Sequence, residues 1–127
     1  MKDSLYVNRV MLAGHLGYPP VLKTAPDGKV FCRFNLATLT AWVDDESRTQ
    51  KIQDWHRCVV WGESAQEFVD ECKSGTHIEL TGRLQPRFIK DGLGMRREIV
   101  EVRVASWQVV SGGRTKVQIP LDDTLAF

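Results

Sequence analysis

Alternating hydrophobic and polar positions dominate the chain and predict five β-strands. The alternating runs are residues 8–14, 32–36, 55–61, 78–84 and 97–104. Because successive side chains of a strand point to opposite faces, this spacing lets one face be buried while the other stays polar. The pair Asp27-Gly28 and the segment DGLG at 91–94 are typical of hairpin turns. Gly82 predicts a bulge or bend within the fourth run.

Two stretches interrupt this alternation. The first strand leaves through HLGYPP at 15–20, where one Gly and two Pro predict an irregular segment. Residues 43–53, VDDESRTQKIQ, carry charges of both signs with no apolar period. They predict a long, mobile loop between the second and third strands. In the fifth run, Val100, Val102 and Val104 share the face expected to be buried, and Glu101 lies on the polar face.

One segment has helical spacing. The tetrapeptide Ser64-Ala65-Gln66-Glu67 matches a capping box, in which the Ser hydroxyl and the Glu carboxylate satisfy backbone N–H groups at the start of a helix. The apolar residues that follow at i, i+3, i+4 and i+7 are Ala65, Phe68, Val69 and Cys72. Gly75 is expected to end the helix as its C-cap.

The order of three strands, one helix and two strands predicts a mainly β fold. It matches the five-stranded Greek-key barrel called the OB-fold, whose helix lies between strands 3 and 4. A small α+β sheet covered by one helix would produce a similar pattern. The barrel is the more informative alternative because its binding face and loops hold oligonucleotides or oligosaccharides.

The length of 127 residues and the 43% hydrophobic content fit one globular domain. We expect this domain at residues 1–110 and a short flexible tail at 111–127. No apolar run approaches the roughly 20 residues of a membrane span. The N-terminus lacks the apolar stretch and cleavage site of a secretory signal. These features predict a soluble, cytoplasmic protein.

Cysteine and histidine spacing predicts neither a disulfide framework nor a metal site. Three cysteines are present without a C-x-x-C pair, and three histidines lie far apart. We therefore expect reduced, packed cysteines and no metal or other cofactor.

Charge is segregated along the chain although the net charge is only +1. Residues 63–71 carry four acidic side chains and no basic one, whereas residues 83–97 carry five basic side chains and one acidic one. Local potential rather than total charge gathers a polyanion, so this segregation allows a basic groove on a nearly neutral protein. Solvated faces with a chance excess of charge would give the same pattern.

Aromatic residues are interleaved with the basic residues. Trp42 lies where the second strand ends, Trp55 and Trp61 share a strand face with Arg57, and Phe88 lies in the basic hairpin. Single-stranded nucleic acid needs this combination, because bases stack on flat rings while phosphates pair with Lys and Arg. For Trp61, as for Trp107, a place in the core or an interface is slightly favoured over stacking.

The basic residues expected to contact phosphates lie on these strands, the basic hairpin and the segment 43–53. They are Arg9, Arg33, Lys51, Arg57, Arg83, Arg87, Lys90, Arg96 and Arg97.

Five stretches resemble the bacterial-type single-stranded DNA-binding proteins in order and spacing. They are NRVMLAGHLGYPP, FNLATLTAW, DWHRCVVWGESAQE, SGTHIELTGRLQPR and SGGR, which together span residues 8–114. The resemblance implies an OB-fold protomer, usually a homotetramer, that binds single-stranded DNA without sequence preference and protects it in replication, repair and recombination. It also implies a cytoplasmic, nucleoid-associated location. A dimer stays open.

The resemblance also implies roles for single residues. The family's stacking aromatics fall on Trp42, Trp55 and Trp61, and its interface-stabilising histidine falls on His56. The family commonly carries a basic residue at the positions of Arg9, Arg57 and Arg87.

One position departs from the family pattern. The family's hairpin Trp falls on Ile89, with Phe88 beside it. Either Phe88 substitutes from an offset position or this stacking contact is weakened.

The end of the sequence, LDDTLAF, looks like a reduced form of the family's acidic tip. That tip binds partner proteins of replication and repair, and the corresponding residues here are Asp122, Asp123, Leu125 and Phe127. Acidic side chains with a terminal aromatic suit a basic-rimmed apolar pocket. A frayed terminus without a function is the alternative.

Two further function classes remain. An accessory replication or primosome protein of the same fold would act mainly through protein partners. An OB-fold nuclease would need carboxylates clustered on one barrel face to hold a metal. The strand spacing places no such cluster, so we do not expect an enzyme.

Overall fold

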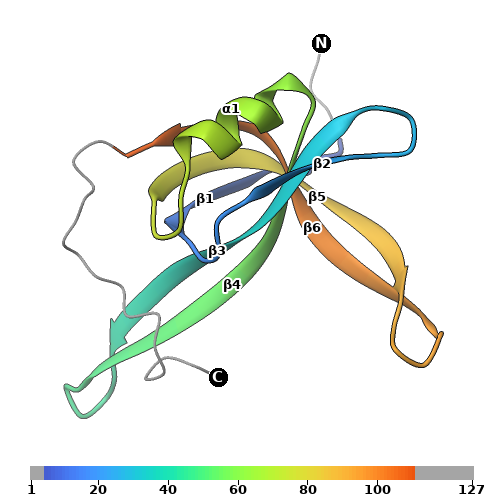
Figure 1. The fold of residues 1–127 in the computed structure, drawn as a ribbon. Helices are drawn as coiled ribbons and strands as arrows, with labels where there is room; N and C mark the ends of the chain where they lie inside the picture. The colour runs from blue at the N-terminus through green and yellow to red at the C-terminus, as the bar shows by residue number, and fades with distance from the viewer. Residues whose placement is uncertain (1–4, 111–127) are drawn as a thin grey trace.

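A computed structural model describes residues 5–110, which form a small β-barrel with one helix (Figure 1). The elements are β1 (Val10–Leu16), β2 (Val21–Thr24), β3 (Val30–Val43), β4 (Thr49–Trp61), α1 (Glu63–Glu71), β5 (His77–Lys90) and β6 (Arg96–Val109). The short strand β2 was not among the five predicted runs. It pairs with β3 through the turn at Asp27-Gly28, which confirms the predicted hairpin.

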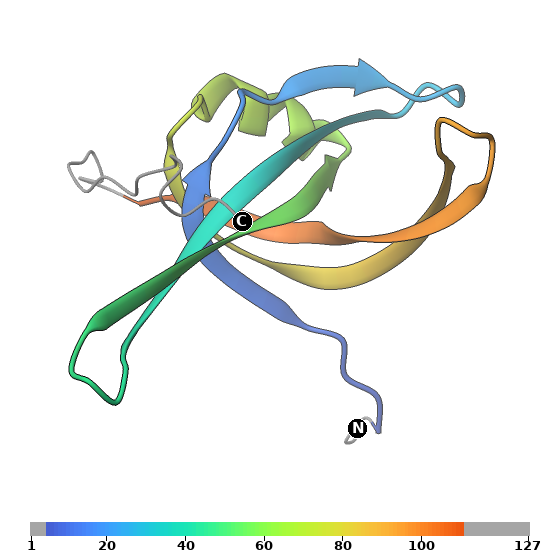
Figure 2. The same ribbon diagram turned by 90° about the horizontal axis from the view of Figure 1, so that it is seen from below.

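Five of these strands close on themselves. The order in the sheet is β1-β5-β6-β4-β3-β2, and β1 also pairs with β3 through His15↔Ala37 and Leu16↔Leu36. A short parallel pairing of β4 with β6, at Cys58↔Val102, joins the two halves of the barrel. Figure 2 shows the resulting closed cross-section. The predicted OB-fold is confirmed, and the helix lies between the third and fourth strands of the barrel.

The core fills the barrel beneath the helix. Cys32, Phe34 and Leu36 are buried on one face of β3, as the alternation predicted. Phe68 of α1 stacks on Phe34 at 4.4 Å between ring centroids and meets the edge of Trp107 at 5.0 Å. All three cysteines are free and buried, as predicted, and burial raises the pKa of each thiol above its ordinary value.

The predicted loop at 43–53 is wrong, because β3 and β4 continue through it as a hairpin. Their pairing runs out to Val43↔Thr49, so only five residues form the turn. Asp44 builds that turn: its Oδ1 accepts hydrogen bonds from the backbone N–H groups of Glu46 and Arg48, each at 2.9 Å. The backbone hydrogen bond from Arg48 is also the main cause that lowers the pKa of Asp44.

Two long hairpins therefore extend from the barrel on the side away from α1 (Figure 1). We call the β3–β4 extension, residues 39–53, the first arm, and the β5–β6 extension, residues 85–100, the second arm. The second arm corrects another prediction: Val100 is exposed rather than buried, because β6 has not yet entered the barrel at that residue.

Both predicted helix caps are wrong. The N-cap is Gly62, whose positive φ of 85° turns the chain directly from β4 into α1, and no side chain caps the helix. Ser64 therefore lies inside the helix. The C-cap is Cys72 in an extended conformation, so Gly75 belongs to the following turn.

The irregularity predicted at Gly82 is confirmed. The β5–β6 register shifts between Thr81 and Gly82, which leaves Ala105 of β6 without an opposite residue. A Cβ at Gly82 would overlap the carbonyl oxygen of Arg103. The close approach of the two strands therefore requires glycine at this position.

The fold brings together two histidines that lie far apart in sequence. His15 and His77 are opposite each other on β1 and β5, and their rings stack at 4.4 Å. Within residues 5–110, no group of three or more His, Cys, Asp or Glu side chains is placed to hold a metal ion. In the same residues, no helix has the length and apolar character to cross a membrane.

Candidate nucleic-acid interface

Three of the four aromatic residues expected to stack on bases are substantially exposed. The exposed fractions of Trp42, Trp55 and Phe88 lie between 44% and 53%. Trp42 is on the first arm opposite Gln50, Trp55 lies at the base of the same hairpin, and Phe88 is on the second arm. A large exposed ring has no packing reason to be on the surface, so these three positions are available to a ligand.

Trp61 has neighbours on the protein instead. Its ring stacks on Phe31 at 4.7 Å between centroids, and the guanidinium of Arg103 lies over the ring, 5.5 Å from its centroid. Arg33 in turn lies over Phe31 at 4.9 Å. The ring of Trp61 is thus part of a column of cations and aromatics on the barrel wall, and it is the least accessible of the four predicted stacking residues.

Phe88 does not lie on the same face of its strand as Ile89. Side chains alternate along β5, so Arg87 and Ile89 share one face and Phe88 points to the other. Arg96 covers Phe88, with its guanidinium 3.9 Å from the ring centroid. The geometry therefore presents Phe88 on the opposite side of the second arm from Arg87.

Two of the predicted phosphate-binding arginines are already paired. Arg33 on β3 and Arg87 on β5 both reach Glu101 on β6, with Nε–Oε2 distances of 2.8 Å and 3.1 Å. Burial alone would raise the pKa of Glu101, but the hydrogen bonds and charge of the two arginines lower it overall. The prediction that Glu101 lies on a solvated face is wrong: it is 4% exposed and joins three strands.

The other predicted phosphate-binding side chains are exposed, and most of them have no acidic partner among residues 5–110. Those predicted contacts without an ion pair to a described residue are Arg9, Lys51, Arg57, Arg83, Lys90 and Arg96. Arg97 lies 4.0 Å from Asp91. A groove of about 420 Å³ brings Arg9, Arg83 and Arg103 together across three segments. Arg103 was not among the predicted phosphate contacts.

His56 lies on β4 and is half-buried. Its Nε2 is 2.9 Å from the hydroxyl oxygen of Thr38 on β3. The structure contains one chain, so the predicted interface role of His56 stays a prediction. The residues of the predicted partner-binding tip, Asp122, Asp123, Leu125 and Phe127, lie outside the described residues.

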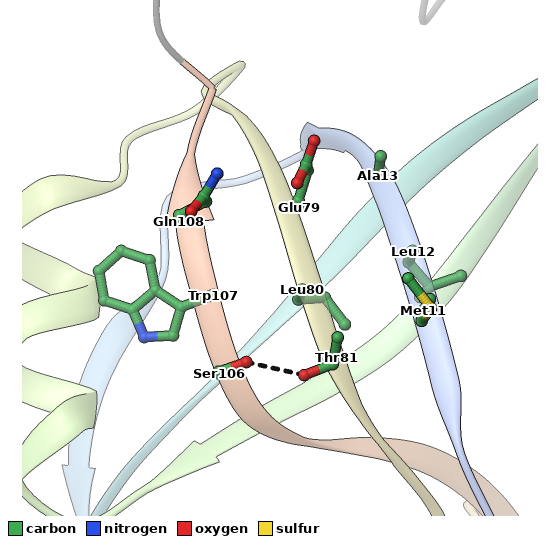
Figure 3. A pocket seen from close by; sticks show the side chains of 9 residues that line it. All are labelled: Met11, Leu12, Ala13, Glu79, Leu80, Thr81, Ser106, Trp107 and Gln108. Atoms are coloured by element: carbon green, nitrogen blue, oxygen red, sulfur yellow. Dashed lines mark hydrogen bonds between the residues drawn. The ribbon is translucent and has the colours of Figure 1, made fainter.

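A further hollow lies on the outer face of β1, β5 and β6 and shares Thr81 with the groove of Arg9, Arg83 and Arg103 (Figure 3). It measures about 510 Å³ and is lined by apolar and polar residues that include Met11, Leu80 and Trp107. A hydrogen bond of 2.7 Å between Thr81 and Ser106 joins β5 and β6 within it. No Lys or Arg side chain lines this hollow, which distinguishes it from the aromatic and basic surface on the arms.

Comparison with known proteins places this fold and surface in a family. Residues 7–110 match the single-strand binding protein family. The chain belongs to that family. It is 33% identical over 114 residues to Single-stranded DNA-binding protein 1 of Chlorobaculum tepidum, an alignment that covers 86% of this chain and 70% of the relative. The resemblance predicted from the sequence is thereby confirmed.

Solved structures of the family share the fold. The Plasmodium falciparum SSB, in complex with single-stranded DNA, superposes with a TM-score of 0.73 at 23% identity, over 86% of this chain and 99% of that one. A deletion mutant of the single-stranded DNA binding protein from Thermus aquaticus gives a TM-score of 0.74 at 29% identity, over 84% of this chain and 52% of that one. This chain thus shares the overall fold of these two structures.

Proposed function

We propose that this protein binds single-stranded DNA without sequence preference and protects it during replication, repair and recombination. The observation that carries the proposal is the exposure of Trp42 and Phe88 on the two arms and of Trp55 at the base of the first arm, together with the unpaired basic residues Lys51, Lys90 and Arg96 on the arms. Bases stack on the rings and phosphates pair with the neighbouring cations. Membership of the single-strand binding protein family supports the same function. It also supports a binding role rather than an enzymatic one.

The phosphate contacts that we propose fall into two classes. Exposed arginines and lysines such as Arg57 and Lys90 contact the strand directly. Arg33 and Arg87 contribute less, because Glu101 neutralises part of their charge. We further propose that the protein assembles as a homotetramer in which His56 stabilises the interface, and that the assembly interacts with replication and repair proteins in the cytoplasm.

Titration of the intrinsic tryptophan fluorescence with oligo(dT) tests the function. Two of the four tryptophans, Trp42 and Trp55, are exposed on the hairpin that forms the first arm and its base, so we expect strong quenching by single strands and little by duplex DNA. The logarithm of the association constant should fall with the logarithm of salt concentration, with a slope of about 0.7 per phosphate neutralised. Absence of both quenching and salt dependence would contradict the proposal. Parallel titration with oligo(U) measures the preference for DNA over RNA.

A further inference from the structure

Two grooves on the barrel meet at Tyr18, a residue with no role assigned above. One groove, of about 450 Å³, is lined by Trp55 together with Gly17, Tyr18, Asn35 and Ser74. The other, of about 270 Å³, contains the arginine cluster around Glu101. Tyr18 and Asn35 line both grooves. The two grooves therefore adjoin at Tyr18 and Asn35.

The backbone that carries Tyr18 is held from several sides. The N–H of Gly17 donates to the carbonyl of Asn35 at 3.0 Å, and the Ser74 hydroxyl donates to the carbonyl of Gly17 at 2.7 Å. The indole of Trp55 lies against Gly17 so closely that a Cβ there would be 2.9 Å from Cζ3 of the ring. Pro19 follows directly, and a residue before proline is restricted to extended conformations. Tyr18 thus has a well-defined backbone.

The side chain of Tyr18 is nonetheless 85% exposed, more than Trp42, Trp55 or Phe88. Within residues 5–110 its hydroxyl makes no hydrogen bond. A tyrosine ring offers a large, stiff contact surface that has only two side-chain torsions to fix on binding. An exposed ring on an anchored backbone therefore loses little conformational entropy when it stacks on a ligand.

A cation lies at the right place for the phosphate of a stacked nucleotide. Arg57 is exposed, lines the second groove with Tyr18, and has no ion pair to a described residue. It is the direct cross-strand partner of Asn35, which lines both grooves. The Tyr18 ring, the Asn35 amide and the Arg57 guanidinium thus all line the second groove.

We propose that Tyr18 is a base-stacking residue, and that one nucleotide of single-stranded DNA binds with its base on Tyr18 beside Trp55 and its phosphate on Arg57. The inference rests on the proposed function and adds a subsite to it. Tyr18 lines the same groove as Arg87, whereas Phe88 points to the opposite face of the second arm from Arg87.

Binding of oligo(dT) by three variants of the full chain tests the subsite. Tyr18→Ala should weaken binding by about 5- to 100-fold, the range that corresponds to one stacked base. Tyr18→Phe should bind within about twofold of the wild type, because stacking needs the ring and not the hydroxyl. Tyr6→Ala is the matched control, since Tyr6 is 86% exposed but lines neither groove. Equal losses in the Ala and Phe variants of Tyr18, or in Tyr6→Ala, would overturn the proposal.

Photo-crosslinking of the wild type gives a second readout that does not depend on a variant's folding. An oligonucleotide that carries 5-iododeoxyuridine should crosslink to the peptide that contains Tyr18, and mass spectrometry maps the modified residue. A wild type that binds and crosslinks only elsewhere would refute the subsite and leave the proposed function intact. A wild type that does not bind oligo(dT) at all would refute the proposed function itself.

Discussion

Neutralising Glu101 should destabilise the barrel measurably while preserving its shape. Glu101→Gln keeps the size of the side chain and removes the charge that Arg33 and Arg87 share. Removing one partner of a fully buried ion pair costs about 3 to 5 kcal/mol. Here the carboxylate is 4% exposed but the two arginine side chains are 37% and 36% exposed, so water solvates them after the substitution. The glutamine carbonyl also still accepts a hydrogen bond, so we expect a loss of about 1 to 2 kcal/mol.

Urea denaturation at fixed protein concentration measures this loss. With a slope of about 1 to 3 kcal/mol per molar urea, the midpoint should fall by roughly 0.5 to 1.5 M. Glu98→Gln is the matched control, because Glu98 is an exposed residue of the same strand without an ion pair to a described residue. Its midpoint should stay close to that of the wild type.

The direction in which the stability contributed by Glu101 changes with pH follows from the pKa of this carboxylate. The arginines lower the pKa of Glu101 in the folded state below its unfolded value of about 4.3. The carboxylate therefore contributes its full stabilisation above that value and loses it as the pH falls through the folded pKa. The difference between wild type and Glu101→Gln should be largest near neutrality and shrink in acid. A difference that equals the Glu98→Gln control, or that persists unchanged at pH 3, would refute the reasoning.

Four other substitutions separate binding, folding and assembly. Trp42→Ala and Trp55→Ala should each weaken oligo(dT) binding by about 1 to 3 kcal/mol per lost stacked base, measured by fluorescence anisotropy, with unchanged far-UV circular dichroism; wild-type affinity in both would contradict the stacking mechanism. Gly82→Ala should lower stability by about 1 to 3 kcal/mol in thermal unfolding, because its methyl group meets a backbone carbonyl, whereas Gly92→Ala enters open space and serves as the control. His56→Tyr should shift sedimentation toward smaller species on dilution, since we propose that His56 stabilises the interface between protomers; a mass that stays the same would count against an interface role.

The barrel was predictable because its strands bury one face. Cys32, Phe34 and Leu36 alternate with polar residues, and the structure buries all three. The first arm was missed for the same physical reason. It extends away from the core, so its outer half buries neither face and carries no apolar period. The turn at Asp44, whose carboxylate accepts local backbone hydrogen bonds, was the available signal for a hairpin.

The residue types of the candidate site could be predicted from the sequence, but the ion pairs among its residues could not. Exposed aromatics among bases point to a stacking surface, and Trp42, Trp55 and Phe88 are exposed. The Arg33–Glu101 ion pair joins residues 68 positions apart, and no local pattern encodes such a separation. Tyr18 was missed because it lies in a segment that Gly and Pro mark only as irregular. Its importance depends on grooves that form when β1, β3 and β4 come together.

The division between barrel and arms allows the residue at position 89 to vary without harm to the fold. Leu84 pairs with Val102, the core residue of β6 nearest to the second arm. In the arm itself, β5 and β6 pair only with each other, and no residue of the arm belongs to the core. A change such as Ile89 for an aromatic residue therefore alters the binding surface and leaves the barrel's packing unchanged. Substitutions at the barrel end, such as those of Gly82 and Glu101, act on stability instead. The second arm thus contributes to the binding surface without contributing to the core.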